Sequence, residues 1–362
     1  MIKQATSILK GHSLTYWRIA QVFVAAVGLG ILLLLIFLPE IGIHAFWNVL
    51  IPIAPILFVV AVGLWRNTCP LASTSLISNH LHFSKKKRLK VKQRGRLQLI
   101  SVILLLVIIP LRHTIFNTSG HATALILTLL ALIAFYVGHR YHWKSAWCSS
   151  LCPIHPVEKL YGKKSAFELP NAHCKLCVNC VSPCPDSTKP SKNPIKKKRR
   201  LNANIAEVLM VGGFPGFIWG WFQVPDYTHG EGWKHLMITY AYPIVAMAFT
   251  LIVFLILKKM IAKKNKAILV NLFATAAVSI YYWYRFPALI GFGMFHQDGM
   301  LVDLSQMLPD WFPVLLQFST TLFFSWWIIF NKKETASWVI RPPYANQRKS
   351  IPKFNSITNK SF

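Results

Sequence analysis

The chain has 362 residues, of which 54% are hydrophobic and only 14% are charged, and its mean hydropathy is +0.43. Because so few polar side chains cannot cover a soluble globule, this composition excludes a soluble enzyme, a disordered tail and a disulfide-stapled secreted domain. The net charge of +29 would indicate nucleic acid as the partner of a soluble protein. Here the charges lie between long apolar runs, so the sequence predicts an all-α polytopic membrane protein that binds no nucleic acid.

Eight apolar segments are long enough to cross a lipid bilayer, which takes about 20 mostly apolar residues. They are residues 17–39, 41–65, 98–116, 121–138, 205–224, 236–257, 267–284 and 312–330. The first is too long for a signal-peptide core and lacks a small-residue cleavage site, so we expect it to be retained. The spans divide the chain into a four-helix membrane half (1–138) with a Cys-Pro turn at 66–97, a cysteine-rich segment (139–204), a second four-helix half (205–330) and a basic tail (331–362).

The basic residues fall almost entirely on one side of these spans. An even number of spans puts both termini on the same side, and that side holds 37 of the 40 Lys and Arg residues. The opposite side holds only Arg112, Lys234 and Arg285. The positive-inside rule makes the basic side, with both termini, cytoplasmic in a bacterial inner membrane. Runs such as 85–88 and 196–200 are expected to contact anionic lipid headgroups, at about 1 kcal/mol per charge.

Two Cys-Pro turns follow successive pairs of spans in the first half. The first reads Trp65-Arg-Asn-Thr-Cys69-Pro70, and the second reads Trp147-Cys148-Ser-Ser-Leu-Cys152-Pro153. The second is a C-x3-C-P sequence, and Trp65 stands where the first turn lacks a cysteine. All seven cysteines of the chain lie in the two large loops predicted to be cytoplasmic. In a reducing compartment this indicates thiols that bind metal or do redox work, not structural disulfides.

The segment Cys174-Lys-Leu-Cys177-Val-Asn-Cys180-Val-Ser-Pro-Cys184-Pro185 matches C-x2-C-x2-C-x3-C-P residue for residue. This is the spacing with which bacterial ferredoxins bind a [4Fe–4S] cluster. A zinc knuckle is the alternative, but zinc sites favour paired C-x2-C units or sets of Cys and His. The sequence therefore predicts a small ferredoxin-like iron–sulfur segment on the cytoplasmic side.

The fourth cysteine of such a run normally binds a different cluster, so another Cys-Pro must replace it. The simplest assignment gives one cluster to Cys174, Cys177, Cys180 and Cys152. It leaves Cys69, Cys148 and Cys184, one thiolate short of a second four-cysteine cluster.

Three alternatives remain for these leftover cysteines. A second cluster has only three irons or a non-cysteine ligand, for which His155 and His173 are the nearest candidates. Alternatively, the run 174–184 holds one cluster alone, and the other thiols form a redox or copper(I) site, since soft thiolates favour copper(I). In the third alternative the leftover thiols are redundant.

Spans joined by Cys-Pro turns and followed by a ferredoxin-type run resemble the membrane ferredoxins of the NapH/NosR/CcoG kind, the 4Fe-4S binding domain family, over about residues 41–190. The resemblance implies iron–sulfur electron transfer at the cytoplasmic membrane, often feeding or maturing a periplasmic reductase or oxidase. Lys175, Lys189, Lys192 and the run 196–200 would attract an acidic donor such as a soluble ferredoxin or flavodoxin, besides orienting the chain.

The opposite side carries histidines that are candidate ligands of a periplasmic b-haem or metal ion. They are His113, His121, His229, His235 and His296. His113 and His121 flank a short turn at 117–120 and are expected to lie close together. The alternative is that these histidines bond to headgroups, water or backbone.

Two polar, glycine-bearing loops on the same side, at 226–235 and 291–299, would form a quinol pocket, a metal site, a docking surface or plain connections. The glycines of 212–216 are expected to kink the fifth span and to mark it as a cofactor or quinone contact. We expect Arg112 and Arg285 to extend to the interface, and residues 281–284 and 326–327 to belong to aromatic belts.

Together these features predict an inner-membrane iron–sulfur protein that passes electrons between a cytoplasmic donor or the quinone pool and a partner redox enzyme. The alternative is a copper or iron reductase, or an assembly factor for a respiratory enzyme. Transport is disfavoured, because no charged residue lies deep in a predicted span.

Overall fold

A computed structural model describes residues 12–87, 89–142, 144–162, 166–167, 169, 172–173, 201–227, 231–262, 265–295 and 298–331. These residues are mostly helical and include no strand; one isolated bridge joins Lys87 and Tyr141. In chain order the elements are α1 (His12–Phe37), α2 (Pro39–Ile43), η1 (His44–Leu50), α3 (Ile51–Thr68), α4 (Pro70–His80), α5 (Val91–Ile108), η2 (Arg112–Phe116), α6 (Gly120–Arg140), η3 (Lys144–Leu151), α7 (His155–Tyr161), α9 (Leu201–Val208), η7 (Leu209–Gly213), α10 (Phe214–Trp221), η8 (Glu231–His235), α11 (Leu236–Met260), α12 (Lys266–Leu289), α13 (Phe312–Ser325) and η10 (Trp326–Phe330).

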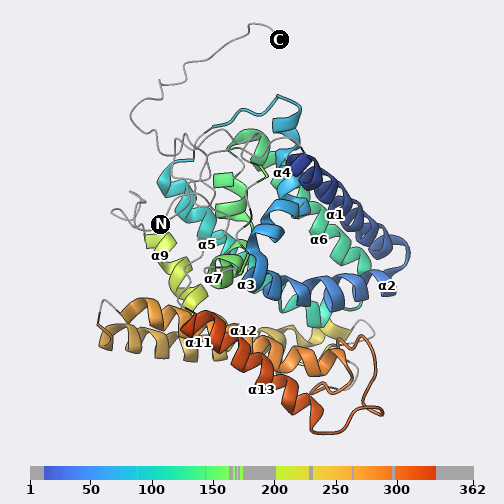
Figure 1. The fold of residues 1–362 in the computed structure, drawn as a ribbon, viewed down its shortest axis with the longest axis vertical. Helices are drawn as coiled ribbons and strands as arrows, with labels where there is room; N and C mark the ends of the chain where they lie inside the picture. Colours follow the sequence, from blue (N-terminus) through green and yellow to red (C-terminus); the bar gives the residue numbers. More distant parts are fainter. Residues whose placement is uncertain are drawn as a thin grey trace, which may run out of the picture.

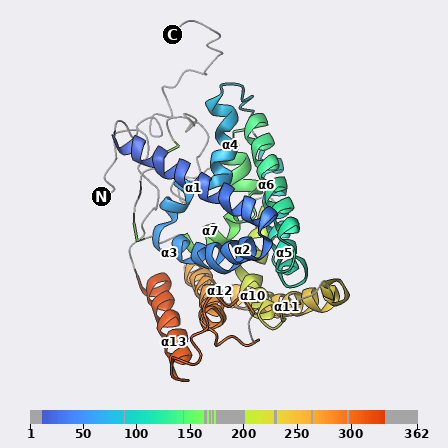
Figure 2. The same ribbon diagram turned by 90° about the vertical axis from the view of Figure 1, so that its right-hand side faces the viewer.

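The helices form two layers that follow the order of the chain (Figures 1 and 2). Helices α1 to α7 form the upper layer in both views, and α10 to α13 form the lower one. One apolar core joins the layers, because Phe58 of α3 and Val102 of α5 belong to the same buried cluster as Phe217 of α10 and Ala277 of α12. The two membrane halves expected from the sequence therefore share a core.

Seven segments among the described residues are long and apolar enough to cross a membrane. They are His12–Phe37, Pro39–His80, Gly120–Arg140, Leu201–Trp221, Gly232–Met260, Lys266–Leu289 and Phe312–Phe330. Many of their apolar side chains are exposed, which is the normal state of a helix that faces lipid. The protein is a multi-pass α-helical membrane protein, as its composition predicts.

The eighth expected span, residues 98–116, is not among these seven. Its helix, α5, begins at Val91 with Lys92, Arg94 and Arg96 in its first turns, and it ends at Ile108, two residues before a proline. Proline interrupts helices because it lacks an N–H group and clashes with the preceding turn. The segment resumes as the π-helical turn η2, so the sequence was wrong to predict one continuous helix there.

Helix α3 is broken at Ala61, whose φ of −144° and ψ of 57° are not helical. The carbonyl of Val60 is released from the helix and accepts hydrogen bonds from the backbone N–H groups of Ala166 (2.7 Å) and Phe167 (3.2 Å). The break thus anchors the loop that follows α7 against α3. It places residues 166–167 of the cysteine-rich segment beside the middle of α3.

The glycines of 212–216 serve close helix packing. They lie in the π-helical η7 and at the start of α10, and all of them are buried. A Cβ atom on Gly216 would lie 2.0 Å from the carbonyl oxygen of Ala246, and one on Gly212 would lie 2.7 Å from the ring of Phe254. Helix α11 therefore fills the face that was expected to contact a cofactor or quinone.

Tyr282 is fully buried and not part of an aromatic belt, contrary to the expectation from the sequence. Its hydroxyl accepts a hydrogen bond from the backbone N–H of Ile56 (3.0 Å) and donates one to the carbonyl of Pro52 (2.6 Å). These two groups are the donor and acceptor of one helical turn of α3, so the hydroxyl is inserted into that turn. The contact fastens α12 to α3.

We expect Tyr282→Phe to lower the free energy of unfolding by about 1–3 kcal/mol, because it leaves both backbone groups of α3 without their partner. Thermal unfolding in detergent, followed by circular dichroism, measures this loss. Tyr242→Phe is the matched control, since Tyr242 is 51% exposed on α11. Equal unfolding temperatures for the two variants would contradict the bridging role.

Candidate functional site

Three cysteines gather at one end of the helices, here called the cysteine end: Cys69, Cys148 and Cys152. Cys69 and Cys148 both pack against Ala72 and Leu76 of α4, and Cys148 packs in the same apolar cluster as Cys152. All three carry thiols, not disulfides. The fold therefore brings together the two Cys-Pro turns, which lie some 80 residues apart in the sequence.

Cys152 lies in an apolar setting held by α5. Its side chain is buried, and its carbonyl accepts a hydrogen bond of 2.7 Å from the hydroxyl of Ser101. Burial raises the pKa of the Cys152 thiol to about 12, and the neighbouring Cys69 adds to the rise. Without a metal to displace its proton, this thiol stays neutral.

A buried ion pair joins the two Cys-Pro turns. The Arg66 guanidinium near the end of α3 bonds to the carboxylate of Glu158 in α7, and His155 Nδ1 lies 4.0 Å from the same carboxylate. Burial acts to raise the pKa of Glu158, but the charge of Arg66 outweighs it and holds the pKa below its ordinary value. Glu158 is therefore a carboxylate that ties α7 to α3.

The chain enters the ferredoxin-like run beside these turns. The backbone N–H of Ala172 donates to the side-chain oxygen of Asn67 (3.0 Å), and His173 Nε2 donates to the carbonyl of Arg66 (3.2 Å). His173 is only 1% exposed. The residue immediately before Cys174 is thus held against the turn that carries Cys69.

The ferredoxin-like run itself lies outside the described residues. This applies to Cys174, Cys177, Cys180 and Cys184, and also to Lys175, Lys189, Lys192 and the run 196–200. Within the described ranges, no three His, Cys, Asp or Glu side chains form a group that would hold a metal ion.

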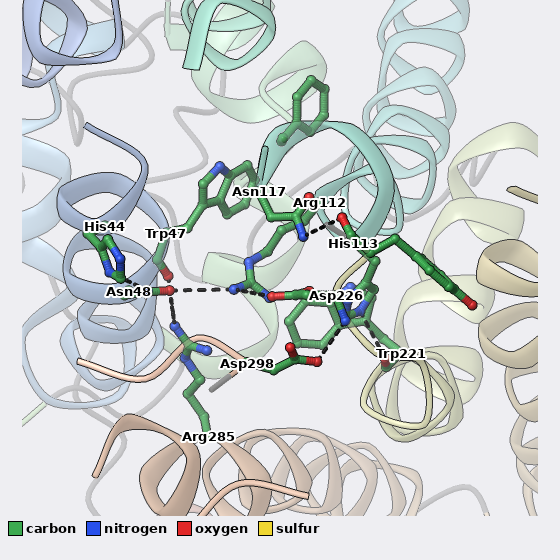
Figure 3. Close-up of polar contacts among 12 residues, drawn as sticks. His44, Trp47, Asn48, Arg112, His113, Asn117, Trp221, Asp226, Arg285 and Asp298 are labelled. Atoms are coloured by element: carbon green, nitrogen blue, oxygen red, sulfur yellow. Dashed lines mark hydrogen bonds and ion pairs between the residues drawn. The ribbon is translucent and has the colours of Figure 1, made fainter. Parts of the chain in front are cut away.

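A second polar cluster, here called the arginine end, lies where η1, η2 and the loop after α10 meet the end of α12 (Figure 3). Arg112 binds the Asp226 carboxylate through both terminal nitrogens. Nη1 lies 3.3 Å from Oδ1, and Nη2 lies 3.1 Å from Oδ2. Asn48 Oδ1 accepts from Arg112 Nη2 (3.4 Å) and from Arg285 Nη2 (2.8 Å). Arg285 Nη2 also donates to the carbonyl of Trp47 (3.0 Å).

His113 has both ring nitrogens engaged. Nδ1 lies 2.5 Å from Asp226 Oδ1, and Nε2 lies 3.0 Å from the carbonyl oxygen of Trp221, which can only accept a hydrogen bond. Burial alone would raise the pKa of Asp226, but Arg112 and His113 lower it to about 2, so its carboxylate also only accepts. His113 therefore lies between the Asp226 carboxylate and the end of α10, with an acceptor oxygen beside each ring nitrogen.

Asp298 belongs to the other polar loop of this end. Its Oδ2 accepts a hydrogen bond of 2.7 Å from the backbone N–H of Asp226, so the two polar loops expected from the sequence do meet. Burial and the nearby charge of Asp226 raise the pKa of Asp298 to about 6. Asp298 is thus poised to change charge near neutral pH.

Gly299 lets this loop lie directly on the two arginines. Its φ is +68°, a conformation that favours glycine. A Cβ atom there would lie 2.0 Å from Arg285 Nη1 and 3.2 Å from Arg112 Nη2. The loop is fastened to α12 by backbone bonds from Leu301 to Leu289 and from Leu304 to Ile290.

Several expectations for this side need correction. Arg112 and Arg285 do not extend to the interface; they are only 5% and 3% exposed. His113 is buried whereas His121 is exposed, and a ligand role for His113 would break two hydrogen bonds.

Among the described residues, the remaining candidate histidines belong to no group of three or more possible metal ligands, and a b-haem bound by histidines stays a prediction. His235 stacks on Tyr227 with ring centroids 4.2 Å apart. His229 and His296 lie outside the described residues.

Asn48 and Trp221 are the members of the arginine end that sequence reasoning missed. The sequence did reveal the charged residues with which they interact. Arg112 and Arg285, two of the three basic residues on this side, stand at the ends of apolar spans, and Asp226 follows a third span. Ionisable groups at such depth usually pair with one another. No family model, curated protein or solved structure matches the chain.

Proposed function

We propose that this protein is a membrane-bound iron–sulfur electron carrier, which passes electrons between a cytoplasmic donor or the quinone pool and a partner redox enzyme. The run C-x2-C-x2-C-x3-C-P at 174–185 carries the proposal, because this spacing is typical of [4Fe–4S] ligation. The gathering of three further cysteines where that run begins supports it. The resemblance to the NapH/NosR/CcoG membrane ferredoxins is part of the same proposal.

The chemistry of the available donors fits such a cluster, since all are cysteine thiols. Cys174, Cys177, Cys180 and Cys152 would hold it, and it would supply reversible one-electron transfer. The described residues contribute position and burial: Ser101 orients the Cys152 backbone, and the Arg66–Glu158 pair holds the two Cys-Pro turns together. The burial of Cys152 excludes water from that sulfur, and exclusion of water from a ligand tunes the reduction potential of a cluster.

The charge distribution suggests where the partners bind. By the positive-inside rule we assign the cysteine end to the cytoplasmic face of a bacterial inner membrane, because the loops around it carry most of the basic residues. The basic residues around the run would attract an acidic donor, such as a soluble ferredoxin or flavodoxin. An acceptor on the other face would need a further carrier, since the membrane core is about 30 Å thick.

Anaerobic purification with iron and acid-labile sulfide assays, and electron paramagnetic resonance of the reduced protein, tests this function. We expect about four irons per chain for one cluster and seven or eight for two. Cys177→Ser should lose the four irons of the first cluster and its resonance signal. Stoichiometric zinc without iron would exclude the electron-carrier function.

A second candidate is a copper or iron reductase, or an assembly factor for a respiratory enzyme. The observation that favours it is the gathering of Cys69, Cys148 and Cys152, because soft thiolates select copper(I). It predicts copper(I) binding to the iron-loaded protein that Cys69→Ser weakens. Unchanged copper(I) affinity in that variant would exclude this site.

A further inference from the structure

A partly open pocket at the arginine end contains an unpaired guanidinium. Its lining includes three basic side chains, Arg112, His113 and Arg285, and two carboxylates, Asp226 and Asp298. Asp226 forms an ion pair with Arg112, whereas Arg285 has no carboxylate partner among the described residues. Buried charges are costly unless they are paired. The described residues therefore leave the charge of Arg285 unpaired in this pocket.

The two guanidinium groups also have unused hydrogen-bonding capacity. Arg112 Nε is buried and has no hydrogen-bond partner among the described residues. Arg285 donates to two neutral oxygens, of Trp47 and Asn48, and no described carboxylate lies within ion-pair distance of it. A guanidinium presents its donors in a planar fork that matches the oxygens of a phosphate.

The rest of the pocket is apolar and aromatic. Trp221, Phe222, Tyr284 and Phe295 line it. Arg112 lies over the Trp221 ring, 5.5 Å from its centroid, which holds the guanidinium in place. The pocket thus combines two guanidinium groups that can bind an anion with aromatic side chains that can contact an apolar group.

We propose that Arg112 and Arg285 bind a singly charged phosphate group in this pocket. One negative charge compensates the unpaired charge of Arg285, and the oxygens occupy the donors that the protein leaves unused. The phosphodiester of an anionic lipid headgroup is the favoured source, because the pocket lies at the ends of two membrane-compatible segments, Leu201–Trp221 and Lys266–Leu289, and has apolar walls. Free phosphate is the other source. This proposal stands independently of the iron–sulfur function.

Delipidated full-length protein in detergent provides the test. Native mass spectrometry and thermal unfolding compare three probes: dioctanoyl phosphatidylglycerol, dioctanoyl phosphatidylcholine and inorganic phosphate. We expect phosphatidylglycerol to bind and to raise the unfolding temperature, and phosphatidylcholine, whose phosphate is neutralised by choline, to do so more weakly. Arg285→Gln should weaken binding by about tenfold or more, the usual contribution of a charge-assisted hydrogen bond.

Lys234→Gln is the matched control, because it removes a positive charge from an exposed position on the same side. It should bind as the wild type does. Preference for phosphatidylglycerol identifies a lipid headgroup, and binding of inorganic phosphate alone identifies free phosphate; each supports the site. Absence of binding by both, or equal binding by wild type and Arg285→Gln, would overturn it.

Asp298→Asn keeps the test decisive if Arg285→Gln fails to fold. It retains both arginines and removes one negative charge that faces the anion, so it should bind phosphatidylglycerol several-fold more tightly at pH about 7.5, since two charges a few ångströms apart interact by about 1 kcal/mol or more. Unchanged or weaker binding by this folded variant would count against the phosphate site.

Discussion

Asp226→Ala is expected to destabilise the protein by about 3–5 kcal/mol, because removal of one partner from a buried ion pair leaves an uncompensated charge. Here Arg112 loses its carboxylate partner, and His113 loses a hydrogen-bond partner as well. The variant should unfold at a markedly lower temperature in detergent. Asp226→Asn, which keeps the shape but not the charge, should be intermediate.

Asp310→Ala is the control for this prediction, because Asp310 is exposed in the loop before α13. If Asp226→Ala and Asp310→Ala unfold at the same temperature, the network does not stabilise the fold. Mild acid should not mimic the mutation. The pKa of Asp226 is lowered from 3.8 to about 2, so its stabilisation is complete above pH 3.8 and is lost only as the pH falls through about 2.

Cys152→Ser is expected to remove most of the iron from the purified protein, whereas Cys184→Ser should leave about four irons per chain. The reason is the proposed ligand set, in which Cys152 completes the cluster begun by Cys174 and Cys184 belongs elsewhere. Iron analysis and the resonance signal of the reduced protein measure both variants. Similar expression levels and unfolding temperatures would show that the comparison concerns ligation.

The opposite pattern would decide between the remaining assignments. If Cys184→Ser loses the iron and Cys152→Ser keeps it, the run 174–184 holds one cluster by itself. Cys69, Cys148 and Cys152 would then form the separate thiol or copper(I) site. Iron loss in both variants would indicate two interdependent clusters.

The class of the fold was predictable from the sequence because it depends on local composition. Runs of about 20 apolar residues specify membrane helices wherever they occur. The failure at 98–116 was also local in origin: the helix ends at Ile108, two residues before Pro110, and a count of apolar residues gave this proline too little weight.

The environment of individual side chains was not predictable, since it depends on contacts between distant segments. The sequence predicted that Tyr282 belongs to an aromatic belt at the membrane interface, but it is buried against α3. The sequence predicted that the glycines of 212–216 mark a contact with a cofactor, but helix α11 packs directly against them.

By itself, the sequence determined the helical membrane class and carries the prediction of a cluster at the cysteine run, because composition and ligand spacing are properties of neighbouring residues. Only the tertiary structure decided that the two Cys-Pro turns meet. Only the tertiary structure decided that Arg112, His113 and Arg285 converge on Asp226 and Asn48. Such buried partnerships arise only when helices far apart in the chain pack together, so neighbouring residues in the sequence do not reveal them.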